Sequence, residues 1–207
     1  SAVIDLAVYS NALRRVGKYR VYIPNGYRTT SISYPTLYLL HGIDGNETHW
    51  TDRNLGNMKP ICDKYFAERP FEKRIVVMPD GASLWYRDTK DDSCKYETFL
   101  FTELIPDVER RFRCLSTRET RAVTGLSMGG YGALHTAMRR PDLFSSCYAM
   151  SAVVFSEQDA LGAPFPMFLR AFRSSADQKE SDPRIDEYFH DHCLFDLGER
   201  LTDEQKK

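Results

Sequence analysis

Short apolar segments alternate with longer amphipathic ones from the start of the chain to about residue 155. Runs rich in Val, Ile and Tyr are typical of strands. Residues 2–8 and 19–23 lie close together and predict an antiparallel pair. Four further short runs predict strands, at residues 36–40, 74–78, 121–124 and 146–150. All of these except 121–124 are apolar enough to be buried on both faces of a sheet.

Apolar residues between these strands recur at helical spacing. Leu104, Val108 and Phe112 fall at i, i+4 and i+8, which is one face of a helix. Residues 57–68 and 130–139 also have a helical pattern. The alternation of strand and helix predicts the α/β class, with a mostly parallel central sheet and helices on both of its faces.

The character of the chain changes after Phe155. Residues 156–207 are rich in Asp, Glu, Ser and Pro, and Pro166 interrupts their one apolar cluster. We find no further buried strand there and expect helices and loops that act as a lid. The chain is therefore predicted to be a single domain, with a core over residues 1–155 and a lid-like region over residues 156–207.

The composition of the chain says more about its binding partners than about its fold. The 207 residues carry 28 Lys and Arg against 29 Asp and Glu, which gives no reason to expect nucleic acid or an anionic membrane surface. No apolar run approaches the ~20 residues that span a bilayer. The five cysteines are scattered without a C-x-x-C pair, which argues against a zinc site and favours reduced thiols in a cytoplasmic protein. The compartment, a removed signal peptide and a homo-oligomer all stay open.

The strand at 121–124 leads directly into the pattern G-x-S-x-G, with Ser127 at its centre. A strand that delivers the serine and a helix that leaves from it are the context of a nucleophile elbow. Gly125 and Gly129 supply the small residues that such a sharp turn needs. The Met128 amide, at the helix N-terminus, is then a candidate oxyanion donor. The alternative is a glycine-rich turn that only packs a helix on a sheet.

A second oxyanion donor is expected in the loop after an earlier strand. The segment Leu-Leu-His-Gly-Ile-Asp-Gly at 39–45 follows the strand at 36–40, and we assign the Ile43 amide to this role. We interpret His41 as a structural residue of the loop. A general base is expected after the nucleophile in chain order, which disfavours His41.

Several segments together resemble one branch of the α/β-hydrolases, the putative-esterase family. This family includes tributyrin, feruloyl and acetyl-xylan esterases, S-formylglutathione hydrolase and the antigen 85 mycolyltransferases. The resemblance runs from about residue 5 to about residue 155. The segments that carry it are residues 39–50, 76–81, 96–99, 103–106, 125–134 and 141–144.

The resemblance implies the α/β-hydrolase fold, Ser127 as nucleophile and the amides of Ile43 and Met128 as the oxyanion hole. It also implies that Trp50 and Tyr86 lie near the acyl or alcohol pocket, although Trp50 could equally be a packing residue. Leu126 stands before the nucleophile, where S-formylglutathione hydrolases usually carry His. This points to the tributyrin and feruloyl esterases, which need no metal or organic cofactor.

A serine nucleophile also needs a histidine base and a carboxylate that orients it. Family members carry these residues after later strands, which we do not find before Lys207. We expect at least one further strand–helix–strand unit, roughly 30 residues, beyond that point. The alternatives are a short paralogue without catalysis and a rebuilt triad. The rebuilt triad would use His190 or His192 with Asp186 or Asp191, although these histidines fit a solvated loop or helix end better.

The sequence therefore predicts a serine carboxylesterase that acts on small acyl or aryl esters. Its partner is a small-molecule ester. The alternatives are a binding protein on an inactive hydrolase scaffold and an acyltransferase of the antigen 85 type. His135, on the helix after the nucleophile, is expected to face solvent or a covering helix.

Overall fold

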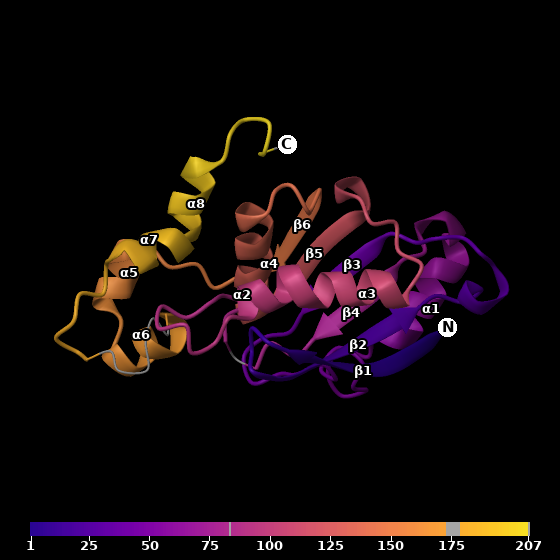
Figure 1. Cartoon of the computed structure of the whole chain (residues 1–207), viewed down its shortest axis with the longest axis horizontal. Helices are drawn as coiled ribbons and strands as arrows, with labels where there is room; N and C mark the ends of the chain where they lie inside the picture. Colours follow the sequence, from indigo (N-terminus) through magenta and orange to yellow (C-terminus); the bar gives the residue numbers. More distant parts are fainter. Residues whose placement is uncertain (83, 173–178, 207) are drawn as a thin grey trace.

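The computed structural model describes residues 1–82, 84–172 and 179–206 of the chain. Its centre is a six-stranded sheet in the order β1-β2-β4-β3-β5-β6 (Figure 1). The pairs β1–β2 and β2–β4 are antiparallel, whereas β4–β3, β3–β5 and β5–β6 are parallel. The strands are β1 (Ala2–Ser10), β2 (Arg15–Ile23), β3 (Thr36–Leu40), β4 (Ile75–Pro79), β5 (Arg121–Leu126) and β6 (Ser146–Met150).

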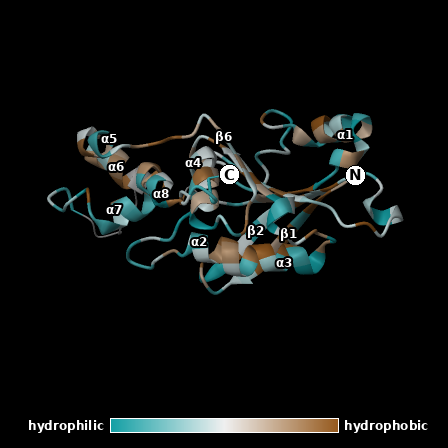
Figure 2. Cartoon of the chain, turned by 90° about the horizontal axis from the view of Figure 1, so that it is seen from above, coloured by the Kyte–Doolittle hydropathy of each residue, from teal (hydrophilic) through white to brown (hydrophobic). Residues whose placement is uncertain are grey.

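Helices cover both faces of this sheet, as the sequence predicts. Figure 2 shows α1 on one face and α2 and α3 on the opposite face. A π-helical turn at Leu100–Leu104 joins α2 to α3. None of the helices in the described part of the chain is long and apolar enough to cross a membrane. The helices are α1 (Met58–Glu68), α2 (Tyr96–Phe99), α3 (Ile105–Arg111), α4 (Met128–Arg139), α5 (Glu157–Gly162), α6 (Phe165–Phe172), α7 (Glu187–His192) and α8 (Leu194–Arg200).

Successive residues of the central strands enter two separate apolar clusters. In β4, Ile75 and Val77 belong to the larger cluster, which includes residues of α2, α3 and α4, while Val76 and Met78 belong to the smaller one beside α1. This alternation follows from the strand geometry, in which neighbouring side chains point to opposite faces. It explains why these strands are apolar at consecutive positions: both faces are covered.

One strand departs from this rule. Residues 146–150 were predicted to form a buried strand. In the structure the first three residues of β6 are exposed, and Tyr148 is 69% exposed. The reason is position, because β6 is the edge strand of the sheet and pairs only with β5 in the described part of the chain. Apolar content alone does not distinguish an edge strand from a central one.

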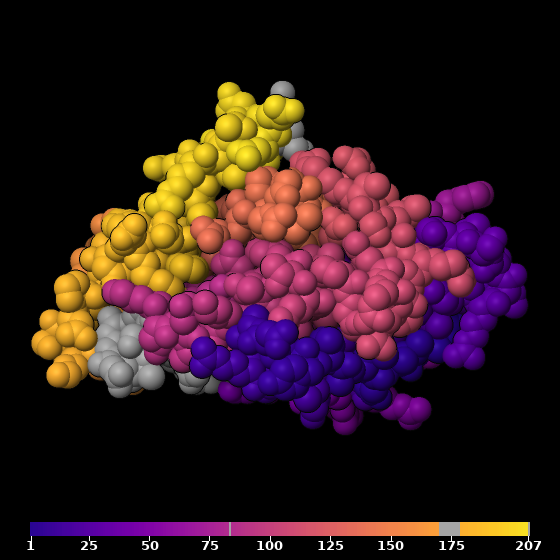
Figure 3. Space-filling view, in the orientation of Figure 1, coloured from indigo at the N-terminus to yellow at the C-terminus, as the bar shows by residue number. Residues whose placement is uncertain are grey.

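The C-terminal region consists of helices and loops, as expected from its composition. Among residues 156–172 and 179–206 the structure describes four helices and no strand. These helices lie at the β6 end of the sheet, far from β1 (Figure 1), and the yellow C-terminal segment projects beyond the body of the molecule (Figure 3). Their role as a lid stays a prediction.

A hydrogen bond to the buried carboxylate of Asp107 fixes α3 to the antiparallel end of the sheet. Asp107 is 5% exposed and accepts a hydrogen bond of 2.5 Å from the hydroxyl of Tyr19 on β2. Arg111, one turn later on α3, donates to the same carboxylate at 2.8 Å. Burial raises the pKa of Asp107, but the hydrogen bonds from Tyr19 and Arg111 outweigh it and bring the pKa below its ordinary value.

We expect Asp107→Ala to lower the free energy of unfolding by about 2–3 kcal/mol, because it leaves the buried Tyr19 hydroxyl without its acceptor. The matched control is Asp142→Ala, which breaks a pair with Arg140 at the surface and should cost less than about 1 kcal/mol. A lowered carboxyl pKa adds stability above the ordinary pKa, and that stability is lost as the pH falls through the folded-state value. Urea denaturation should therefore show the cost of Asp107→Ala shrinking below about pH 4. An unchanged cost there would contradict this assignment.

Candidate active site

Ser127 occupies a strained corner between β5 and α4. Its backbone has φ 58° and ψ −114°, a region that a residue with a side chain rarely adopts. The surrounding main chain holds it there. The Ser127 amide donates to the Met150 carbonyl at 2.9 Å, and the Ser127 carbonyl accepts from the Tyr131 amide at 3.0 Å. Ser127 is half-buried, so its side chain is not enclosed in the core.

The corner depends on close main-chain approach at two glycines. A Cβ atom on Gly125 would come within 3.0 Å of the main chain of Gly129. A Cβ atom on Gly129 would come equally close to the carbonyl groups of Leu40 and His41. Only glycine fits at such positions, because the neighbouring atoms belong to the backbone and cannot rotate away. The N-terminus of α4 is thus pressed between the ends of β5 and β3.

The loop after β3 lies directly beside the serine. A Cβ atom on Gly42 would lie 3.6 Å from the Cβ atom of Ser127. This contact occurs where the strand order reverses, since the chain leaves β3 toward β4 on one side and β5 lies on the other. In open α/β sheets such a switch point, at the carboxyl ends of the strands, is where ligands bind.

Two main-chain amides at this point have no acceptor among the described residues. The Ile43 amide follows Gly42 in the loop, and the Met128 amide belongs to the first residue of α4. The first amides of a helix have no partner within it and carry partial positive charge. The two predicted oxyanion donors therefore lie in the segments next to Ser127, one in the loop after β3 and one at the start of α4. Their role in binding an oxyanion stays a prediction.

His41 fixes this loop and is not placed to act as a base. Its Nε2 atom accepts from the Gly81 amide at 2.7 Å, and its Nδ1 atom donates to the Gly42 carbonyl at 2.7 Å. Both ring nitrogens are thus occupied and the imidazole is neutral. Burial lowers the pKa of His41, which is only 1% exposed. This geometry agrees with the structural role expected from chain order.

Tyr86 supports the loop from beneath. Its side chain is fully buried, and its hydroxyl donates to the His41 carbonyl at 2.9 Å. Its ring fills the space beside Gly132, where a Cβ atom would come within 3.0 Å of it. The ring is not open to solvent in this structure, and the expected place of Tyr86 near the pocket stays a prediction.

Trp50 packs against the smaller apolar cluster, which also contains Met58 of α1. It is half-buried, and its ring lies 5.7 Å from that of His49. This placement favours the packing alternative for Trp50. A contact with substrate stays a prediction.

Comparisons with known proteins identify the family and the fold. The family model described as Putative esterase matches residues 10–203. The chain belongs to this family. A solved ferulic acid esterase superposes with a TM-score of 0.78 at 29% identity, covering 99% of this chain and 74% of that one. The serine hydrolase FphF of Staphylococcus aureus, at 23% identity and a TM-score of 0.71, covers 96% of this chain and 72% of its own and supports the fold. The family and the α/β-hydrolase fold predicted from the sequence are both confirmed.

Curated relatives are much longer than this chain. An esterase of Mycobacterium tuberculosis strain H37Rv is 36% identical over 143 residues, which are 67% of this chain but 30% of that protein. An endo-1,4-beta-xylanase/feruloyl esterase of Xylanibacter ruminicola is 32% identical over 68% of this chain and 20% of its own length. This member of the family thus spans less than a third of these two relatives.

The sequence missed one aromatic residue near the nucleophile. Trp85 packs against Tyr131, one turn after Ser127, with ring centres 5.4 Å apart, and against Phe155 at 6.3 Å. Trp85 and Tyr86 both have positive φ angles, which turn the chain sharply before α2. No local pattern signals the packing of Trp85, because its partners Tyr131 and Phe155 are far from it in the chain.

The described histidines do not form the rebuilt triad. His190 pairs with Asp196 at 2.7 Å, whereas Asp186 caps α7 and Asp191 pairs with Arg200. His192 was expected on a solvated segment but is only 7% exposed, because it packs against α4. Among the residues that the structure describes, Ser127 has hydrogen bonds only through its main chain.

The two helical glycines at 129 and 198 should respond in opposite ways to alanine. We expect Gly129→Ala to lower the free energy of unfolding by at least about 2 kcal/mol, because its methyl group meets the Leu40 carbonyl. Gly198 in α8 has only Met138 Cε within 4.0 Å, so Gly198→Ala should raise stability by about 0.5–1 kcal/mol. Urea denaturation of both variants measures this. Equal effects would mean that the close approach at Gly129 is unimportant.

Proposed function

We propose that this chain carries the nucleophile and oxyanion hole of a serine carboxylesterase for small acyl or aryl esters. The observation that carries the proposal is the strained, half-exposed Ser127 beside the Gly42 loop. Strain of this kind costs roughly 1–3 kcal/mol and persists at functional sites, where it positions a reacting group. A turn that only packed a helix would not need it.

Each group has a defined task in this proposal. The Ser127 hydroxyl attacks the ester carbonyl carbon and gives its proton to a base, and the carbonyl oxygen becomes an oxyanion. The amides of Ile43 and Met128 donate to that oxyanion; removing one such donor in a known protease costs roughly 2.7–4 kcal/mol of barrier lowering. The tetrahedral centre collapses, the alcohol leaves with a proton, and water hydrolyses the acyl-enzyme.

The neighbouring proteins support the ester class. The related proteins named above are described as an esterase, a feruloyl esterase and a ferulic acid esterase. We therefore favour aryl esters within the proposed class.

The proposal also requires a base that accepts the Ser127 proton. His41 has both nitrogens occupied, and His190 and His192 bind other partners. The alternative of an inactive scaffold predicts an unactivated Ser127 hydroxyl.

Labelling with a fluorophosphonate separates an activated serine from an inactive scaffold. We expect stoichiometric labelling at Ser127 and hydrolysis of p-nitrophenyl butyrate that Ser127→Ala lowers by at least about 10⁴-fold. The matched control is Ser145→Ala, at an exposed hydroxyl bonded to the Glu119 carbonyl, which should label and turn over normally.

Unchanged turnover in Ser127→Ala would end the proposal. No labelling in the 207-residue chain would favour the inactive scaffold for the chain as it stands. Product analysis with added alcohols distinguishes transfer from hydrolysis, because an acyltransferase would form a new ester with the acceptor.

A further inference from the structure

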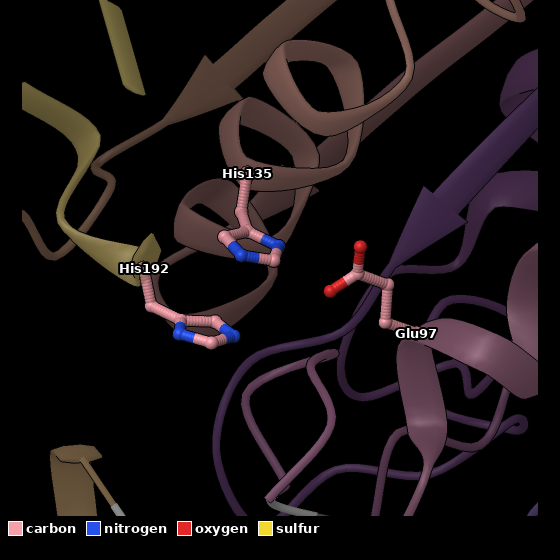
Figure 4. Close-up of side chains that lie close together, drawn as sticks. All are labelled: Glu97, His135 and His192. Carbon is pink, nitrogen blue, oxygen red and sulfur yellow. The ribbon is translucent and has the colours of Figure 1, made fainter. Parts of the chain in front are cut away.

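Three ionisable side chains meet in the interior, away from Ser127. Glu97 comes from α2, His135 from α4 and His192 from the last residue of α7. One ligand atom from each lies within 4.8 Å of the others, and the three residues are 8%, 0% and 7% exposed. Figure 4 shows a nitrogen of each imidazole turned toward the carboxylate of Glu97. His135 lies eight residues after Ser127, which is about 12 Å along the helix.

His135 is the unusual member of this cluster. Both of its ring nitrogens are buried and neither has a hydrogen-bond partner in the described structure. Its faces stack between Tyr131 at 5.6 Å and His192 at 5.2 Å, so the ring is held firmly while its polar edge is unpaired. Burying an unpaired polar group costs roughly 1–3 kcal/mol, so such a group calls for a ligand that binds it.

His192 is arranged as metal-binding histidines are. Its Nδ1 atom donates to the Tyr188 carbonyl at 2.8 Å, which leaves the Nε2 lone pair free to bind a ligand. Imidazoles that bind a metal through one ring nitrogen usually donate a hydrogen bond from the other, often to a main-chain carbonyl.

We propose that Glu97, His135 and His192 form a structural site for a transition-metal dication, with Zn²⁺ the best fit. Two imidazole nitrogens and one carboxylate oxygen suit zinc and its neighbours, whereas Ca²⁺ and Mg²⁺ prefer oxygen ligands only. Bond lengths near 2.0–2.2 Å place tetrahedral ligands roughly 3.3 Å apart. Small side-chain rotations close the remaining distance. The ion would fasten α7 to α2 and α4.

The surroundings leave room for a fourth ligand. A surface hollow of about 360 Å³ is lined by Glu97 and His192, two of the three members of the cluster. Arg139 donates to one oxygen of Glu97 at 2.9 Å, and the second oxygen remains available to an ion. The nearby guanidinium of Arg87 makes cation–π contacts with the rings of Tyr131 and Tyr188. These positive charges, together with those of Lys90 and Arg140 at the hollow, oppose a bound dication and weaken the site.

Metal titration of the full chain tests the proposal. One equivalent of Zn²⁺ should bind, and Co²⁺ should give the visible bands of a tetrahedral ion that Zn²⁺ displaces. His192→Ala should weaken Zn²⁺ binding by roughly 10–100-fold or more, the loss that even outer groups of metal sites cause. The matched control is His190→Ala, on the same helix but paired with Asp196, which should bind normally. Ser127→Ala should also bind normally, which keeps this test independent of esterase activity.

X-ray absorption at the zinc edge decides the case without any variant. Two imidazole ligands and oxygen, with no sulfur, are expected in the wild-type protein. Zinc–sulfur distances near 2.3 Å would assign the ion to the cysteines and overturn the proposal. So would the absence of stoichiometric binding, or equal affinities of His190→Ala and His192→Ala. Added Zn²⁺ should raise the Tm of the wild-type protein and leave the Tm of His192→Ala unchanged.

Discussion

The close contact between the end of β3 and the start of α4 is the constraint on which the site depends. The main chain of Gly129 touches the carbonyl groups of Leu40 and His41, and Gly125 touches Gly129 in turn. Because no side chain intervenes, the positive φ angle of Ser127 and the position of the Gly42 loop are fixed together. The hydrogen bonds of His41 to Gly42 and Gly81 then hold the loop at this distance. The proposed oxyanion hole would need preorganisation of this kind, because fixed amides can stabilise charge without reorganising.

The fold supplies this contact through its topology. Parallel strands end at the same edge of the sheet, so the loops after β3, β4 and β5 meet there. The buried Tyr86 and Tyr96 tie the loops of β3 and β4 to the core through hydrogen bonds to His41 and Asp80. These two buried rings thus contribute to the rigidity of the loops beside Ser127.

The Glu97–His135–His192 cluster follows a different logic. It joins the C-terminal helices to the core at a point remote from the nucleophile, and its polar atoms are incompletely paired. The stacked rings of Tyr131, His135 and His192 continue along α4 from the turn that holds Ser127. A ligand that tightens this cluster would therefore stabilise the same helix whose N-terminus forms the corner.

The sequence by itself determined the features that depend on neighbouring residues. The G-x-S-x-G corner, the glycines beside it and the strand–helix alternation are local, since steric limits on adjacent residues decide them. The two apolar faces of the sheet follow from consecutive apolar positions. Only the tertiary structure decided the rest: that β6 is an exposed edge, that Tyr86 is buried beneath His41, and that His135 meets His192 and Glu97. These outcomes depend on packing between segments far apart in the chain, which no local pattern records.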